Sequence, residues 1–199
     1  MRCQLPHGPA FWAFLFTVDK DLAQKSQVKI CPCGGGLHQA NYPRKPRGSA
    51  EDLSKDCYRF SFCCGKDGCR KRVTPPSVRF LGRKVYLGAV VVLVSAMRQG
   101  PSPRRVRELS QLFDIDRRTI ARWQIFWREH VPQTPFWKVA RGRLQSMDES
   151  ILLPSSLMKV FLLSDDSGPP SDDPHQAWKH LLLFLAPIST TESSPAEVA

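Results

Sequence analysis

The sequence predicts a mainly α-helical protein with one small β unit, and three observations lead to that fold class. Two pairs of cysteines flank an insert of hairpin length between residues 33 and 64. Two amphipathic helical segments meet at a short turn near residue 115, and residues 164–199 are rich in Ser, Pro and acidic side chains. We therefore expect a small β zinc ribbon, then a three-helix helix-turn-helix bundle, then a disordered C-terminal tail.

These patterns divide the chain into five consecutive parts. We expect an N-terminal apolar extension (1–29), a zinc-ribbon-like domain (30–83), a helix-turn-helix domain (84–143), a short C-terminal helix (144–163) and a disordered acidic tail (164–199). In the extension, four aromatic residues between Phe11 and Phe16 favour a strand over a helix. In the tail, low apolar content predicts that residues 164–199 are dispensable for folding.

Charge is distributed unevenly along the chain. The whole sequence has a formal net charge of +11, from 29 basic and 18 acidic side chains. Residues 70–143 contain 17 of the basic and 4 of the acidic side chains, whereas residues 144–199 contain 2 and 8. A strongly basic middle indicates a polyanionic partner, most often a nucleic acid.

Hydropathy and cysteine usage indicate the cellular compartment. No segment approaches the roughly 20 apolar residues that cross a bilayer, so we expect no membrane partner. Seven cysteines, an odd number, are clustered in a basic chain without a recognisable export signal. This usage favours metal binding over disulfides. We therefore expect a cytoplasmic, nucleoid-associated protein.

The cysteines form two close pairs that suit a structural zinc ion. The predicted ligands are Cys31, Cys33, Cys64 and Cys69. Zinc takes four tetrahedral ligands, and thiolates from two glycine-containing turns supply them. One and four residues separate the members of the two pairs, where a zinc ribbon normally has two in each. Two alternatives stay open, with Cys63 in place of Cys64 and His38 in place of a cysteine.

Basic residues follow the second cysteine pair at once. Arg70, Lys71 and Arg72 stand together, and no acidic residue occurs between Arg70 and Lys84. We expect this run to contact the phosphate backbone of a nucleic acid, since such contacts position a protein on its partner.

Three helices are predicted between residues 85 and 131. Val85–Met97 is apolar on nearly all sides and fits a buried helix that completes the core of the bundle. Ser102 caps the next helix, and Pro103 stands at its first position, where a missing N–H costs nothing. The turn after it is Asp114–Asp116. Asp is among the few residues other than Gly that tolerate a left-handed conformation at such a turn.

The helix after this turn is predicted to begin at an Asp116 cap and to have two contrasting faces. Ile115 and Ile120 form a hydrophobic staple across the cap, and Ile120 continues into a buried stripe with Trp123 and Trp127. A recognition helix needs such a closed face, together with an open face that offers donors to base edges and phosphates. The predicted DNA-binding side chains are Arg117, Arg118, Thr119, Arg122 and Arg128.

The run RELSQLFDIDRRTIARW, from Arg107 to Trp123, resembles the helix-turn-helix of transposases and bacterial regulators. With the cysteine pairs and the basic linker, residues 30–143 resemble the N-terminal DNA-binding region of insertion-sequence transposases and of their small accessory proteins. The resemblance implies binding to double-stranded DNA at element ends or at a control site. The protein could assemble as a homodimer or with a partner transposase, and the sequence does not choose between them. It likewise does not choose between an accessory regulator and a remnant of a transposase.

The sequence has no constellation of catalytic side chains, so we expect a binding protein rather than an enzyme. A transposase nuclease needs several carboxylates that hold two metal ions in a substantial α/β domain. Only 56 residues follow Arg143, and most of their acidic side chains lie in proline-rich segments. Two alternative functions stay open. One is a zinc-ribbon adaptor that binds RNA or another protein, and the other is a small protein that associates with a membrane through Leu87–Met97 and the N-terminal apolar run. Aromatic side chains exposed on the ribbon strands would favour RNA.

Overall fold

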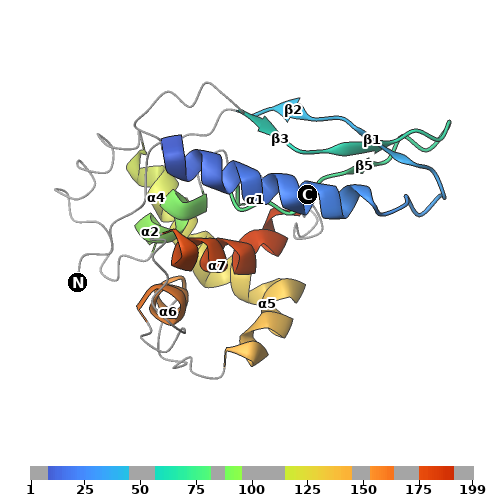
Figure 1. Ribbon diagram of the computed structural model, residues 1–199. Helices are drawn as coiled ribbons and strands as arrows, with labels where there is room; N and C mark the ends of the chain where they lie inside the picture. The colour runs from blue at the N-terminus through green and yellow to red at the C-terminus, as the bar shows by residue number, and fades with distance from the viewer. Residues whose placement is uncertain are drawn as a thin grey trace.

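The computed structural model describes residues 9–44, 57–81, 88–95, 115–144, 153–163 and 175–190. Its α-helices are α1 (Pro9–Gln27), α2 (Gly88–Ser95), α4 (Arg117–Ile125), α5 (Pro135–Ala140), α6 (Ser155–Met158) and α7 (Gln176–Leu185). Short π or 3-10 segments are η1 (Phe126–His130), η2 (Val131–Gln133), η3 (Arg141–Arg143), η4 (Lys159–Leu163) and η5 (Ala186–Ser189). The strands are β1 (Leu37–Gln39), β2 (Tyr42–Pro43), β3 (Tyr58–Arg59), β4 (Phe62–Cys64) and β5 (Arg72–Val73). The fold is mainly helical with a few short strands, as the sequence predicts (Figure 1).

The segment that we expected to be a strand, Phe11–Val18, lies within the long helix α1. The strand prediction is wrong because it follows aromatic content and ignores spacing. Phe11, Leu15 and Val18 are buried and recur at intervals of four and three, which places them on one side of a helix. Packing of that side therefore outweighs the β propensity of the individual aromatic residues.

Three strands form a small antiparallel sheet, which we call the cysteine sheet, with the order β1-β4-β5. The register places Leu37 of β1 opposite Cys64 of β4, and Phe62 of β4 opposite Val73 of β5. Strands β2 and β3 form a separate antiparallel pair. The pairing of β1 with β4 brings the two cysteine-containing turns to the same end of the sheet.

Helix α1 packs on two different hydrophobic clusters. Its first half contributes Phe11 to the large cluster, which also contains Trp123 of α4. Its second half contributes Ala23 to a smaller cluster with Phe62 of the cysteine sheet. In Figure 1, α1 runs from α4 at one end toward the strands at the other. The helix thus connects the helical part of the molecule with the cysteine sheet.

Between these two contacts, α1 places a carboxylate in a fully buried ion pair. Asp19 Oδ2 lies 2.7 Å from Arg79 Nε, and neither side chain is exposed. The same carboxylate accepts hydrogen bonds from Ser77 Oγ at 2.6 Å and from the Val78 N–H at 2.7 Å. The Arg79 guanidinium also lies over four rings, those of Trp12, Phe16, Phe60 and Phe80. Hydrogen bonds and ring contacts together compensate the desolvation of both charges.

Part of the tail that we expected to be disordered is folded. Residues 176–189 form α7 and η5. The prediction fails for this segment because the composition of residues 164–199 as a whole hides apolar side chains at helical spacing. The buried side chains of α7 are Trp178, Leu181, Leu182 and Leu185, and all four belong to the large cluster. Residues 164–174 and 191–199 lie outside the described residues.

A second buried arginine ties η5 to the strands. Arg59 Nη2 donates to the Pro75 carbonyl at 2.6 Å and lies 3.5 Å from Ser189 Oγ. Ser189 Oγ in turn accepts a hydrogen bond from the Ser77 N–H at 2.7 Å. Burial lowers the pKa of Arg59 to about 10, so the side chain stays charged at neutral pH. The end of the α7 segment is therefore part of the folded core.

Other predictions are met in part or fall outside the described residues. The helix predicted over 85–97 is confirmed for Gly88–Ser95. The first helix of the expected helix-turn-helix, at 102–113, lies in the range 96–114, which the structure does not describe. The helix-turn-helix arrangement therefore stays a prediction. Within the described ranges, no helix combines the length and apolar character that crossing a membrane requires.

We predict that α7 is needed for stability, in place of the expectation that the whole tail is dispensable. Leu181→Ala should lower the free energy of unfolding by about 2–5 kcal/mol, because it leaves a cavity in the large cluster. His180→Ala, at an exposed neighbour, is the matched control and should change little. Denaturant unfolding measures both variants. A chain truncated after Leu163 that kept the melting temperature of the full chain would contradict this role.

We also predict that the buried ion pair is needed for the fold. Asp19→Asn keeps the size of the side chain but leaves the Arg79 charge buried without its partner, at a cost of about 3–5 kcal/mol. Asp21→Asn, at an exposed position of the same helix, should have no comparable effect. Thermal unfolding followed by circular dichroism distinguishes the two. Equal melting temperatures for the two variants would show that the pair is dispensable.

Candidate metal centre and nucleic-acid interface

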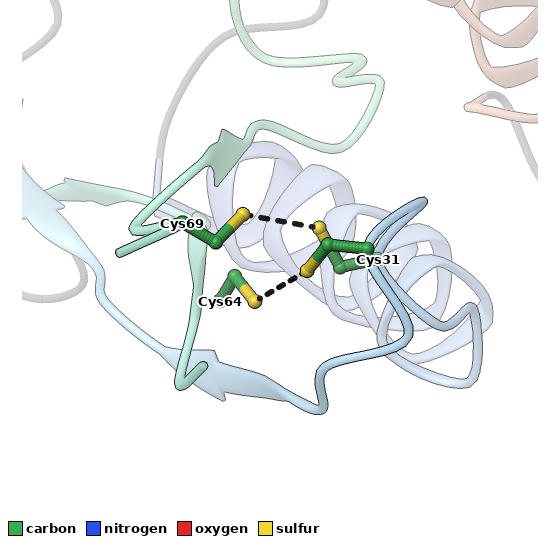
Figure 2. Close-up of side chains that lie close together, drawn as sticks. Cys31, Cys64 and Cys69 are labelled. Carbon is green, nitrogen blue, oxygen red and sulfur yellow. Dashed lines mark hydrogen bonds between the residues drawn. The ribbon is translucent and has the colours of Figure 1, made fainter. Parts of the chain in front are cut away.

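The four predicted cysteine ligands come together in the structure. The Sγ atoms of Cys31, Cys33, Cys64 and Cys69 all lie within 4.8 Å of one another. The Cys31–Cys69 Sγ distance is 3.8 Å, and the Cys33–Cys64 Sγ distance is 3.4 Å; Figure 2 shows both contacts as dashed lines. Tetrahedral metal–sulfur bonds of about 2.3 Å place the sulfurs about 3.8 Å apart. The cluster therefore has the dimensions of a four-thiolate metal site.

Two tight turns direct these sulfurs toward one point. In the first turn, the Gly34 N–H donates to the Cys31 carbonyl at 2.7 Å, and the Cys31 N–H donates to the Gly35 carbonyl at 3.1 Å. Gly34 has a φ of 82°, in the left-handed region that favours glycine. In the second turn, the Lys66 N–H points at Cys64 Sγ at 3.4 Å. Backbone N–H groups thus stabilise negative charge on the sulfurs.

Gly35 lies so close to the cluster that a side chain would not fit. A Cβ atom at this position would lie 2.6 Å from Cys64 Sγ and 2.8 Å from Lys66 Cβ. At the next residue, Gly36, the same test finds no atom within 4 Å. Sequence reasoning did not single out Gly35, because the run of three glycines gives no signal that distinguishes its members. Close backbone approach to a sulfur is the property that separates them.

The thiols of Cys31, Cys33 and Cys64 do not ionise independently. Hydrogen bonds from the Gly35 N–H and from the neighbouring thiols lower the pKa of Cys33 to about 6. For Cys64, the hydrogen bond from the Lys66 N–H favours the thiolate, but burial and the three other sulfurs outweigh it and raise the pKa to about 12. Negative charges that share one small site repel each other in this way. A divalent cation at the centre would relieve the repulsion and permit four thiolates.

The alternative ligands lie outside this cluster. The group that is close enough to hold a metal contains Cys64 and excludes Cys63 and His38. Successive residues of a strand point to opposite faces, and Cys63 Sγ accordingly contacts the Arg70 carbonyl at 3.4 Å. His38 stands opposite Cys63 in the register of β1 with β4 and is exposed. Of the two neighbouring cysteines, Cys64 is therefore the one that lies in the group that could hold a metal ion.

Helix α4 begins with the cap that the sequence predicts. The Asp116 carboxylate accepts hydrogen bonds from the Thr119 N–H at 2.7 Å and from Thr119 Oγ1 at 3.1 Å. These bonds, above all the one from the backbone N–H, lower the pKa of Asp116 below its ordinary value of 3.8. The cap therefore stabilises α4 at pH values above 3.8, and its contribution is lost as the pH falls through the lowered pKa.

The two faces of α4 differ as expected. Ile120 and Trp123 are buried in the large cluster, together with Trp127 of η1 and the staple residue Ile115. The opposite face is open to solvent, and its exposed side chains are Arg117, Arg118, Ala121, Arg122 and Ile125. One side of the helix is therefore fixed to the core, while the other presents guanidinium groups.

Five members of the predicted DNA-binding set make side-chain contacts within the protein. Thr119 is only 5% exposed, and its Oγ1 accepts a hydrogen bond from Arg122 Nη2 at 2.8 Å, so it positions Arg122 and does not lie on the open face. Arg128 lies beyond α4 in η1 and pairs with Glu129 at 2.7 Å. Arg72 Nη1 donates to the Ala40 carbonyl and to Ser61 Oγ, each at 3.3 Å. Arg70 also pairs with Asp67, at 3.7 Å. The exposed basic members for which the structure gives no such side-chain contact are Arg117 and Arg118 on α4, and Lys71 beside the cysteine cluster.

We predict that Gly35→Ala impairs metal binding and Gly36→Ala does not. The added methyl group at residue 35 must displace Cys64 Sγ, whereas the methyl group at residue 36 meets open space. The expected loss of metal affinity for Gly35→Ala is about 10–100-fold, the range seen when supporting residues of metal sites are changed. Competition with a chromophoric chelator measures the affinity of each variant for Zn²⁺. Equal affinities for the two variants would mean that the metal does not sit between these sulfurs.

Comparison with known proteins identifies no relative. No family model, no curated protein and no solved structure matches this chain. The features that bear on function are therefore the chain's own: four sulfurs arranged as a metal site, and a capped helix with one buried and one arginine-rich face.

Proposed function

We propose that the protein binds double-stranded DNA sequence-specifically through helix α4, and that a structural zinc ion held by Cys31, Cys33, Cys64 and Cys69 supports the fold. The observation that carries the proposal is the build of α4. Its first turn is capped by Asp116, its inner face is anchored by Ile120 and Trp123, and its outer face is free for contacts.

The first turn of α4 has the properties that major-groove recognition requires. In a recognition helix the N-terminal residues contact base edges while the opposite face packs on the protein. Arg117, Arg118 and Arg122 are exposed in the first two turns of α4. Each guanidinium offers several N–H donors in a planar fork, which matches O6 and N7 of guanine. The bond from Arg122 to Thr119 uses one donor and orients the others.

Zinc is the metal that best fits the cysteine cluster. Four sulfur ligands in tetrahedral arrangement are typical of structural zinc or of iron in a sulfur site. Four protein ligands leave no open position for a substrate, so the metal would stabilise the fold without taking part in a reaction. We propose that it fixes the cysteine sheet on the second half of α1.

The proposal extends to the biological role that the sequence resemblance implies. We propose a transposase-related accessory or regulatory protein that has no catalytic domain of its own and acts at DNA in the bacterial cytoplasm. Its protein partner would be a second copy of this chain, in a homodimer, or a transposase. A sequence-specific DNA-binding module would suit that role.

The alternative of an RNA-binding adaptor has less support. Stacking on single-stranded bases needs accessible aromatic rings. In the cysteine sheet Phe62 is buried, and Phe60 beside it is buried as well. The ring of Tyr42 lies under the Arg72 guanidinium, and the distance from Arg72 Cζ to the centre of the ring is 5.6 Å. The aromatic side chains of this region are thus used for packing, which favours duplex DNA over single-stranded RNA.

We predict that the two faces of α4 fail in different ways. A duplex site would first be selected from a random pool with zinc-loaded protein. Arg118→Ala should then keep the fold and weaken binding to that site by about 1–3 kcal/mol if the side chain reads guanine. Trp123→Ala should unfold the helical part, since losing a buried aromatic side chain costs about 3–5 kcal/mol. Fluorescence anisotropy and circular dichroism measure the two effects.

The matched control is Lys138→Ala, which removes one exposed positive charge from α5. Its affinity should stay close to that of the wild type. If Arg118→Ala and Arg122→Ala both bind the selected site as tightly as the control does, α4 is not the recognition helix. Selection that returns no preferred duplex would count against sequence-specific binding altogether.

A further inference from the structure

We infer that the end of the cysteine sheet that carries the cysteine cluster is a second DNA-contact surface. It contacts phosphates about one turn of the DNA duplex away from α4. We call this surface the basic tip and define it by Lys29, Lys66, Arg70 and Lys71. The inference rests on the proposed function, because it assumes that duplex DNA is already held by α4. It adds that the protein contacts the duplex at two places, α4 and the basic tip, and that the length of α1 sets the distance between them.

The side chains of the basic tip gather around the cysteine cluster. Arg70 directly follows Cys69, and the contact between Cys69 and Cys31 brings it near the segment before Cys31, which contains Lys29. Lys66 crosses from the second cysteine turn to the first, where Nζ donates to the Cys33 carbonyl at 3.0 Å. All four side chains of the basic tip are exposed. Such a concentration of exposed cations suits a phosphate backbone.

Arg70 has a backbone conformation that points to a role for its side chain. Its φ is 45°, in the left-handed region, and among the described residues it is the one non-glycine residue with a positive φ. Glycine would adopt this conformation without strain. Its side chain is 72% exposed and its contact with Asp67, at 3.7 Å, is a weak surface pair. Residues other than glycine that hold such a conformation are often found at functional positions.

Helix α1 sets the distance between the two basic surfaces. Its first half packs in the same cluster as α4, and the first cysteine turn begins at Cys31, after three residues beyond the end of α1. A helix of 19 residues rises roughly 28 Å. One turn of B-form DNA is about 34–36 Å long. In Figure 1, α4 lies near one end of α1 and strands β1 and β5 near the other. In this inference, a duplex that lies along the molecule meets α4 in one groove and the basic tip near the next turn.

The test compares two variants on duplexes of two lengths. The probes are fluorescein-labelled duplexes of 8 and 16 base pairs, roughly 27 and 54 Å long at 3.4 Å per base pair. The short duplex can reach only one surface, while the long duplex can reach both. Arg70→Gly should lower the slope of log affinity against log salt by about 0.9 on the long duplex, the value of one phosphate contact, and leave it unchanged on the short one. Arg118→Ala should weaken binding to both.

A second variant should change the affinity for the long duplex in the opposite direction. Asp67→Ser removes the carboxylate that competes with phosphate for Arg70, so it should tighten binding to the long duplex and leave binding to the short one unchanged. Because glycine suits a φ of 45°, Arg70→Gly should keep the zinc content and melting temperature of the wild type. A loss of either would mean that Arg70 is structural and would overturn the inference.

The other outcomes are equally decisive. If Arg118→Ala weakens binding on both lengths but Arg70→Gly changes no slope, the basic tip is not a DNA surface and the proposed function stands. If neither variant alters binding, the proposed function fails as well. The tip also exposes Val28 and Ile30, which are 85% and 71% accessible. Retention of the protein on vesicles of phosphatidylcholine and phosphatidylserine, abolished by Arg70→Gly, would assign the surface to a membrane and overturn the inference.

Discussion

The buried contact between Asp19 and Arg79 joins the two parts of the molecule. It lies between the residues of α1 that pack on the helices and those that pack on the cysteine sheet. Separating the partners would leave a buried charge without compensation, which costs far more than an exposed pair is worth. The contact therefore resists any movement of α1 relative to the segment after β5. The four rings around Arg79 exclude water that would otherwise screen the two charges if they moved apart.

This constraint is what gives the proposed interface a fixed geometry. A recognition helix and a second phosphate contact cooperate only if the distance between them varies little, because each loose joint adds an entropic cost to simultaneous binding. Here α4 is anchored through Trp123, the cysteine sheet through Phe62, and both to the same continuous helix. In the function proposed above, metal binding and DNA binding are linked through α1, although the residues proposed for each do not touch.

Local patterns could be predicted from the sequence, and long-range contacts could not. The Asp116 cap and the buried stripe of Ile120 and Trp123 depend on residues three or four positions apart, so their spacing alone revealed them. The cysteine pairs were recognisable by residue type. By contrast, α1 and α7 are defined by burial against distant partners, and their aromatic or acidic surroundings misled the prediction. The charge count also overstates the basic surface, because Arg59 and Arg79 lie inside the protein.

The irregular cysteine spacing has a structural explanation of the same kind. With one residue between Cys31 and Cys33, the first turn is too short to place both sulfurs inward unless the backbone turns back sharply, and the conformation of Gly34 together with the absence of a side chain at Gly35 permits this. With four residues between Cys64 and Cys69, the second turn is longer, and Gly68 at a φ of 79° closes it. A short turn whose backbone comes close to the sulfurs, together with a long turn that folds over it, can enclose the same metal-sized space as two turns of equal length. The number of residues between cysteines is therefore a weaker criterion for a metal site than the backbone freedom beside them.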